Sequence, residues 1–459
     1  MLRCTGARHV HNHLLPTMDG ARPSAPLLKA TVVLMGMSML APFNTLVTAS
    51  EYFREAFAND SALASGFSSG MMALFNATSV VCGLVAALSG SHGGVNMARR
   101  SQWALLFLCI AMSVALFSVL VRPIGAVSQP YVYYAMLLVL SMALALGMAV
   151  YQSATMALCV QLDHHGELVG LVLTGQAAQG VASSLVGFLG MVLANRMPGT
   201  SHALDNQRAA LALFSTTLTL LVVTRLLMNS QLKHYDASAS SGSQTQRSAQ
   251  LSDVLKRIWA VQQRLWRYSL AVMLVFGLTL TIYPAFTSMV RPHMKVEAGV
   301  FVALHYILFN VGDLLGRRFP AFSPRLMLNR SQLIVFSIAR LTFLPLVCSA
   351  NVVKPRGASS CFFCTSVLPD IGFIVTIFAL GLTTGWGATC IMVGGPAHVA
   401  KSSELVVAEG VEDSSNVEAE GLLDTRSQSG ESSVAALLLT LQLVTALTIG
   451  SVLSLTLVM

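Results

Sequence analysis

Asp313 and Arg317 carry opposite charges four residues apart, inside an apolar stretch that runs from residue 301 to residue 318. Residues four apart lie on one face of a helix, so a helix here places both side chains next to each other. A lone carboxylate in hydrocarbon costs at least ~2.5 kcal/mol, and such residues are retained where they pair or line a polar path. Two interpretations follow, a structural ion pair between helices or the lining of a solute path, and we favour the second.

Further polar side chains lie within apolar stretches. Asn310 precedes Asp313 by three residues and shares its face, and an acid, an amide and a guanidinium together can bind the hydroxyls of a sugar. Gln152 can either bond a neighbouring helix or pair with the edge of a purine or pyrimidine. His305 fits a hydrogen-bonded core histidine better than a residue facing the path.

The stretch from residue 35 to residue 53 combines a proline, an aromatic ring and an amide. Pro42 frees a backbone carbonyl within a helix. Phe43 and Asn44 follow it and suit stacking and hydrogen bonding with a planar heterocycle, although a kink with ordinary packing explains them as well. In a stretch of small residues from 174 to 187, Gln176 can either join helices or face a cavity.

The composition is that of a membrane protein with many spans. Of 459 residues, 54% are hydrophobic and 10% are charged, against about 25% charged in soluble domains. The net charge of +8 does not indicate nucleic-acid binding, because the basic residues are spread over loops without interleaved aromatics. The pair Cys361 and Cys364 lacks further ligands for a metal. No HExxH, GxSxG or P-loop motif is present, so we expect a protein that is neither an enzyme nor dependent on a cofactor.

Eleven stretches are long and apolar enough to span a bilayer. They lie at residues 30–50, 63–89, 102–121, 131–159, 168–194, 209–228, 268–290, 299–317, 331–350, 371–392 and 433–458. We therefore expect an all-α polytopic membrane protein.

Polar segments divide these spans into two bundles. A cytosolic segment (1–29) precedes a six-helix bundle (30–228), and a Ser-rich and basic linker (229–267) leads to a five-helix bundle (268–459) with an acidic loop at 396–432. With the N-terminus in the cytosol, 17 Lys and Arg residues fall on the cytosolic side and 8 on the outer side. The positive-inside rule then places the C-terminus outside the cell.

The linker ends in a basic amphipathic stretch, Val254–Arg267, that contains two tryptophans. Basic residues on one face and tryptophans on another are typical of helices that lie in the surface of an anionic leaflet. We expect an interfacial helix here.

Six motifs in chain order resemble those of equilibrative nucleoside transporters. They are LAPFNTLVTASEYF (Leu40–Phe53), TGQAAQG (Thr174–Gly180), IYPAF (Ile282–Phe286), FNVGDLLGR (Phe309–Arg317), ARLTFLPLVCSAN (Ala339–Asn351) and TTGWGATCIMVGGP (Thr383–Pro396). They cover most of the expected membrane portion. The resemblance implies a carrier like those of the major facilitator superfamily, with alternating access to a cavity between the six-helix and five-helix bundles.

The resemblance also implies roles for individual residues. Gln152 corresponds to the amide that meets the nucleobase, and Asp313 and Arg317 correspond to the pair near the ribose. Further residues of the matched motifs are expected to line the cavity (Leu40, Phe43, Asn44, Asn310) or to support packing and gating (Pro42, Gly175, Gln176, Gly180, Arg340, Pro345).

The chain departs from the family pattern at three positions. Phe43 stands where the family has Trp, Thr384 where it has Asn, and Ala177 where it has Gly. These departures bear on the substrate range and suggest a protist or otherwise divergent member. The sequence thus predicts a facilitative or proton-linked carrier of nucleosides or nucleobases in the plasma membrane. A carrier of sugars or amino acids and a non-transporting receptor are the alternatives.

Overall fold

The computed structural model describes residues 25–49, 52–53, 56–57, 59–91, 96–121, 129–163, 166–194, 202–231, 251–284, 286–296, 298–352, 368–410 and 417–458. Within these ranges the regular structure is helical, apart from one β-bridge between Val290 and Val352. Eleven helical stretches in the described part of the chain are long and apolar enough to cross a membrane, as predicted. The CxxC pair at 361 and 364 lies outside the described residues.

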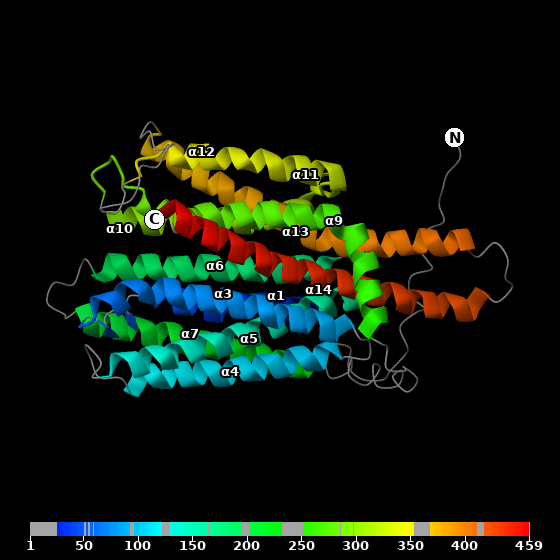
Figure 1. The fold of residues 1–459 in the computed structure, drawn as a ribbon, viewed down its shortest axis with the longest axis horizontal. Coiled ribbons are helices and arrows are strands. Elements are labelled where there is room, and N and C mark those ends of the chain that lie inside the picture. Colours follow the sequence, from blue (N-terminus) through cyan, green and yellow to red (C-terminus); the bar gives the residue numbers. More distant parts are fainter. Residues whose placement is uncertain are drawn as a thin grey trace.

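The helices form two bundles, as Figure 1 shows. The first bundle contains α1 (Ala25–Thr48), α3 (Ser61–Ser91), α4 (Met97–Val121), α5 (Pro130–Leu162), α6 (Glu167–Ala194) and α7 (His202–Gln231). The second contains α9 (Leu251–Ile282), α10 (Ala298–Phe322), α11 (Arg330–Ala339), α12 (Phe343–Cys348), α13 (Asp370–Gly410) and α14 (Val417–Val458). Helices α11 and α12 together make one span, Arg330–Cys348, so the second bundle has five spans and the predicted six-plus-five arrangement is confirmed.

Large apolar side chains cover the outside of the bundles. Phe117, Val139 and Val335 each keep more than 60% of their surface exposed, although they sit in the middle or the outer turns of long helices. A helix that is apolar all round belongs in a core or in a bilayer. Because these side chains point outward, the bilayer is the environment that they fit.

Two contacts join the bundles along their length. On one flank α6 packs against α10, and on the other α14 packs against α3 and α5. In Figure 1, α14 runs obliquely between the two groups of helices. The junction between the bundles therefore consists mainly of the α6–α10 contact and the contacts of α14 with α3 and α5.

The ninth predicted span is interrupted. Helix α11 ends at Ala339, a 3-10 turn covers Arg340–Thr342, and α12 begins at Phe343. Pro345 has no backbone N–H for Leu341, and its ring crowds that carbonyl, which favours the change from α-helix to a 3-10 turn here. The change of geometry places Arg340 at the break.

The polar segments are more helical than predicted. The expected loop at 396–432 is instead the end of α13, up to Gly410, and the start of α14, from Val417. Likewise α9 begins at Leu251, so the second part of the expected linker is helical and continuous with the seventh span. Polar residues do not prevent a helix outside the apolar region, where water can satisfy the side chains.

Candidate functional site

Asp313 and Arg317 form the ion pair that their spacing predicts. Arg317 Nε lies 3.0 Å from Asp313 Oδ2, one turn along α10. Both residues are buried, with 6% and 8% of their surface exposed. Within the described residues, Asp313 Oδ1 has no hydrogen-bond partner. One oxygen of the carboxylate is thus available to another donor.

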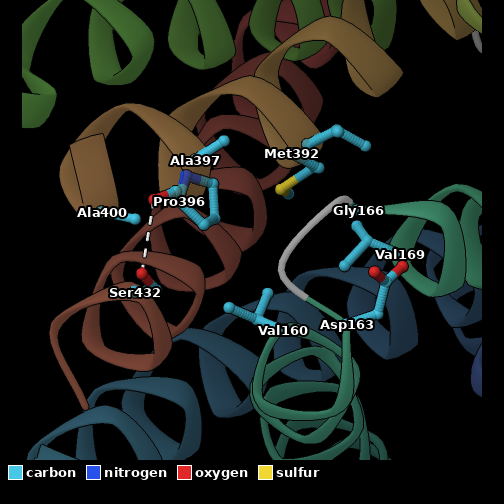
Figure 2. Close-up of a pocket in the computed structure, with 10 residues that line it drawn as sticks. Val160, Asp163, Gly166, Val169, Met392, Pro396, Ala397, Ala400 and Ser432 are labelled. Carbon is cyan, nitrogen blue, oxygen red and sulfur yellow. Dashed lines mark hydrogen bonds between the residues drawn. The ribbon is translucent and has the colours of Figure 1, made fainter. Parts of the chain in front are cut away.

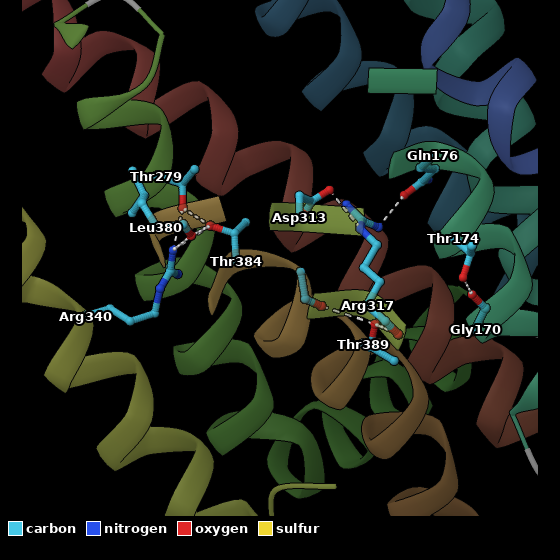
Figure 3. Close-up of polar contacts among 11 residues, drawn as sticks. Gly170, Thr174, Gln176, Thr279, Asp313, Arg317, Arg340, Leu380, Thr384 and Thr389 are labelled. Carbon is cyan, nitrogen blue, oxygen red and sulfur yellow. Dashed lines mark hydrogen bonds and ion pairs between the residues drawn. The ribbon is translucent and has the colours of Figure 1, made fainter. Parts of the chain in front are cut away.

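Arg317 also reaches across to the first bundle. Its Nη1 donates to Gln176 Oε1 on α6 at 3.3 Å, and Gln176 Nε2 lies 3.1 Å from Met39 Sδ on α1. Figure 3 shows Arg317 between Asp313 and Gln176. Because α6 and α10 belong to different bundles, this hydrogen bond is a polar link across the junction.

Glycines set the position of the pair by bringing α10 and α13 together. A Cβ at Gly316 would collide with the Leu382 carbonyl, and one at Gly385 would collide with the Asp313 carbonyl. Glycine is needed where two helix backbones approach this closely. The backbone of Asp313 is therefore in direct contact with α13.

The α6–α10 contact is equally close at Asn310. A Cβ at Gly180 would collide with Asn310 Oδ1. The Asn310 amide donates to Tyr306 O at 2.9 Å and approaches Tyr283 Oη at 3.5 Å. Tyr283 in turn stacks on Phe309 with ring centroids 3.9 Å apart. Sequence reasoning did not assign Tyr283 to the site, although the IYPAF motif pointed to this position.

Arg340 is buried within the second bundle. Its guanidinium donates to the Val275 and Leu380 carbonyls. It also donates to three threonine hydroxyls, those of Thr279, Thr383 and Thr384, at 2.6–3.1 Å. These bonds tie the break between α11 and α12 to α9 and α13 (Figure 3).

Four predicted site residues lie in the first bundle. Leu40 and Phe43 pack against its apolar core, and the Phe43 ring is 5.0 Å from that of Phe75. The Asn44 carbonyl accepts from Thr48, and Gln152 is 9% exposed. Within the described part of the chain, no hydrogen bond links these four residues to Asp313 or Arg317.

The remaining predicted residues take part in helix packing and in the buried core. Helix α1 continues through Pro42. A Cβ at Gly175 would collide with the Val33 carbonyl, so this glycine allows α6 to contact α1. His305 is fully buried among aromatic rings, and neither ring nitrogen has a hydrogen-bond partner among the described residues. It is thus a core residue, as expected, but not a hydrogen-bonded one.

A small pocket lies at the end of the molecule where α5 connects to α6 (Figure 2). Residues from both bundles line it, among them Asp163 and Val169 from the first and Met392 and Ser432 from the second. Its volume is about 20 Å³, enough for roughly one water molecule. The pocket contains none of the predicted site residues and is too small for a nucleoside.

Comparison with known proteins agrees with this architecture. Residues 229–412 match the family model described as "Nucleoside transporter". The chain is also similar to the equilibrative nucleotide transporter 2 of Arabidopsis thaliana, with 28% identity over 130 residues. Both comparisons thus show a likeness to nucleoside transporters over part of the chain. The match to the Arabidopsis protein covers 28% of this chain and 27% of that relative's length.

Solved structures of similar fold cover nearly the whole chain. The proton:xylose symporter XylE of the major facilitator superfamily, bound to 6-bromo-6-deoxy-D-glucose, superposes with a TM-score of 0.55 at 10% identity, over 94% of each chain. A partially occluded, inward-open structure of XylE from E. coli gives 0.53 at 11% identity, over 95% of this chain and 97% of that one. At such identities the likeness shows the fold alone, and it is the fold of major facilitator transporters.

Proposed function

We propose that this protein is an alternating-access carrier of nucleosides or nucleobases. The proposal rests on one observation above all, the buried Asp313–Arg317 pair, which lies on α10 at the junction of the two bundles and bonds Gln176 across it. The match of residues 229–412 to the nucleoside transporter model and the major facilitator fold support the same function. In a carrier, this junction is where the substrate must be admitted and released.

The chemistry of the pair suits a ribose. Hydroxyls of a sugar donate to a carboxylate in short, charge-assisted hydrogen bonds, and Asp313 Oδ1 has no other donor among the described residues. Arg317 supplies donors for a ring oxygen or a hydroxyl. On the opposite side, Gln152 offers a donor and an acceptor for the edge of a base, and Phe43 offers a ring for stacking. Leu40, Asn44 and Asn310 would line the same space.

The structure has the two bundles in contact at the pair, so admission of a substrate requires them to separate. Separation breaks the bond from Arg317 to Gln176, and the polar groups of the solute replace it. A substrate shifts the balance between conformations by binding one of them more tightly. We propose that the protein alternates between states in which the junction opens to one side of the membrane or to the other.

The deciding experiment is uptake by the charge-altered variants Asp313→Asn and Arg317→Leu. Radiolabelled adenosine, uridine and hypoxanthine are offered to cells that lack endogenous nucleoside transport. We expect at least a tenfold loss of uptake for both variants at normal surface amounts, because a buried charge that loses its partner disrupts binding and packing. The matched control is Arg291→Leu, at an exposed position between α9 and α10, and should transport normally. Wild-type uptake by either site variant would refute the proposed role of the pair.

Several finer properties belong to the same proposal. We place the protein in the plasma membrane with its N-terminus in the cytosol, on the positive-inside rule. Proton linkage would act through Asp313, an acid within a span. Uptake that does not respond to external pH or to a protonophore would make the carrier equilibrative.

Competition by unlabelled sugars and amino acids tests the other substrate classes. Absence of saturable flux in liposomes would indicate a receptor.

A further inference from the structure

The first turns of α9 have an exposed apolar stripe beside a basic flank. Leu255, Trp259 and Trp266 are 49%, 64% and 53% exposed. At about 100° per residue, these three side chains fall within an arc of about 40°. The opposite side of the same turns packs into the protein, because Val261 and Leu265 are fully buried. The stripe therefore faces away from the molecule.

Lys256 and Arg267 form the basic flank, about 60° and 80° around the helix from the edge of the stripe. Arg257 and Arg264 lie on the side opposite to the stripe, toward α14. Arg264 is paired with Glu431 at 3.0 Å, and the Arg267 guanidinium lies 5.2 Å from the centroid of the Trp266 ring. Lys256 is exposed. Asp253 is the sole acid between residues 251 and 296, so the sequence of this helix offers little to neutralise the cations.

The orientation of this segment differs from that of the membrane helices. Figure 1 shows the first turns of α9 running across the end of the bundles, whereas the rest of α9 runs along the other helices. The segment contacts α14 through Arg264 and Glu431, and α9 also touches α3 of the first bundle. Because the other helices run along the bundles as spans do, a helix that crosses the end of the bundles is oriented parallel to a membrane surface.

We propose that residues 255–267, the surface helix, dock onto the headgroups of an anionic lipid leaflet. The apolar stripe enters the interface, where tryptophan rings are favoured, and the cations of the flank meet anionic headgroups. Clusters of Lys and Arg beside apolar residues bind such leaflets through both contributions. This interaction is independent of the substrate, so it goes beyond the proposed transport function.

The test is quenching of tryptophan fluorescence by brominated lipids in reconstituted full-length protein. Two preparations of phosphatidylcholine liposomes are compared. One contains a small fraction of brominated phosphatidylserine, and the other contains the same fraction of brominated phosphatidylcholine. Subtracting the signal of Trp259→Phe/Trp266→Phe isolates the two exposed rings, and both substitutions leave the fold unchanged because the side chains are exposed. We expect brominated phosphatidylserine to quench about twofold more than brominated phosphatidylcholine, with the difference falling at high salt.

The charge requirement is tested with Lys256→Gln/Arg267→Gln. This variant should quench equally with both brominated lipids. The matched control, Arg291→Gln/Lys295→Gln, removes the same charge from exposed positions beyond the other end of α9 and should keep the preference. Equal quenching by both lipids in the wild-type chain overturns the proposal. So does a preference that survives loss of the two flank cations.

Discussion

At the scale of single residues, Arg317 is the group that connects the two bundles. It shares its guanidinium between Asp313 on its own helix and Gln176 on α6. A hydrogen bond to a charged group contributes about 1.5–3 kcal/mol. The bond to Gln176 thus stabilises the closed contact by an amount that matters to a balance between conformations.

Gln176→Leu should therefore change the transport cycle. A bond of about 1.5 kcal/mol corresponds to a factor of about ten in an equilibrium constant. Loss of the bond should therefore shift the equilibrium toward separated α6 and α10 by about tenfold. We expect an altered maximal uptake rate at an unchanged surface amount, measured with labelled nucleoside over a range of concentrations.

Gln179→Leu is the matched control for Gln176→Leu. Gln179 lies on the same helix, but its amide donates to Ser183 of that helix and not to the other bundle. Its replacement should leave uptake close to the wild-type rate. If both variants behave alike, the bond across the junction has no part in the cycle.

The sequence predicted part of this site. The period of the helix alone places Asp313 beside Arg317, so the spacing was sufficient. The partner Gln176 could not be identified as such, because no local pattern states which helix of the other bundle packs against α10. The same holds for the threonines around Arg340, which come from two other helices.

At the scale of elements, the close contact of α10 with α13 holds the pair in place. Gly316→Ala puts a methyl group against the Leu382 carbonyl, which cannot move without shifting α13. Overpacking of this kind costs about 1–3 kcal/mol. We expect a lower thermal midpoint for the detergent-purified protein, together with reduced uptake.

Gly170→Ala is the corresponding control on α6. A Cβ at this glycine meets no atom within 4 Å, so it fits without displacement. Alanine favours the helix over glycine by about 1 kcal/mol, and the thermal midpoint should be unchanged or higher. A Gly316→Ala protein as stable as Gly170→Ala would show that the α10–α13 contact can relax.

The helices themselves were predictable to within a few turns, because length and apolar content are sufficient for a membrane span. Pro345 favours the break at Arg340, but a proline alone does not predict one, because α1 and α13 continue through Pro42 and Pro396. The extension of α13 past Pro396 to Gly410 could not be anticipated, since the acidic residues there fit a loop and a solvated helix equally well.

At the scale of the whole molecule, transport requires the bundles to move relative to one another. Asn76 of α3 and Ser451 of α14 lie on opposite bundles, with Asn76 Nδ2 3.4 Å from Ser451 Oγ. Asn76→Cys/Ser451→Cys should form a disulfide on oxidation that holds this flank closed. We expect uptake to fall on oxidation and to recover with a reductant.

The controls for the oxidant are the two single cysteine variants and the wild-type chain. The wild-type chain is included because it has free cysteines of its own. Their uptake should not respond. Full uptake by a double variant whose cross-link has been verified by electrophoresis would mean that α3 and α14 stay together during the cycle, and the motion would have to be confined to the α6–α10 flank.

Helix α14 supports both bundles, because it packs on α3 and α5 of one and on α9 and α13 of the other. It is also the last of these helices to leave the ribosome. During biosynthesis α3 and α5 therefore present their main contact surface for the second bundle to lipid or to the insertion machinery until α14 has been synthesised. A nascent chain that stalls before residue 417 carries every residue of the Asp313 site, yet it lacks the helix that closes the flank opposite to it.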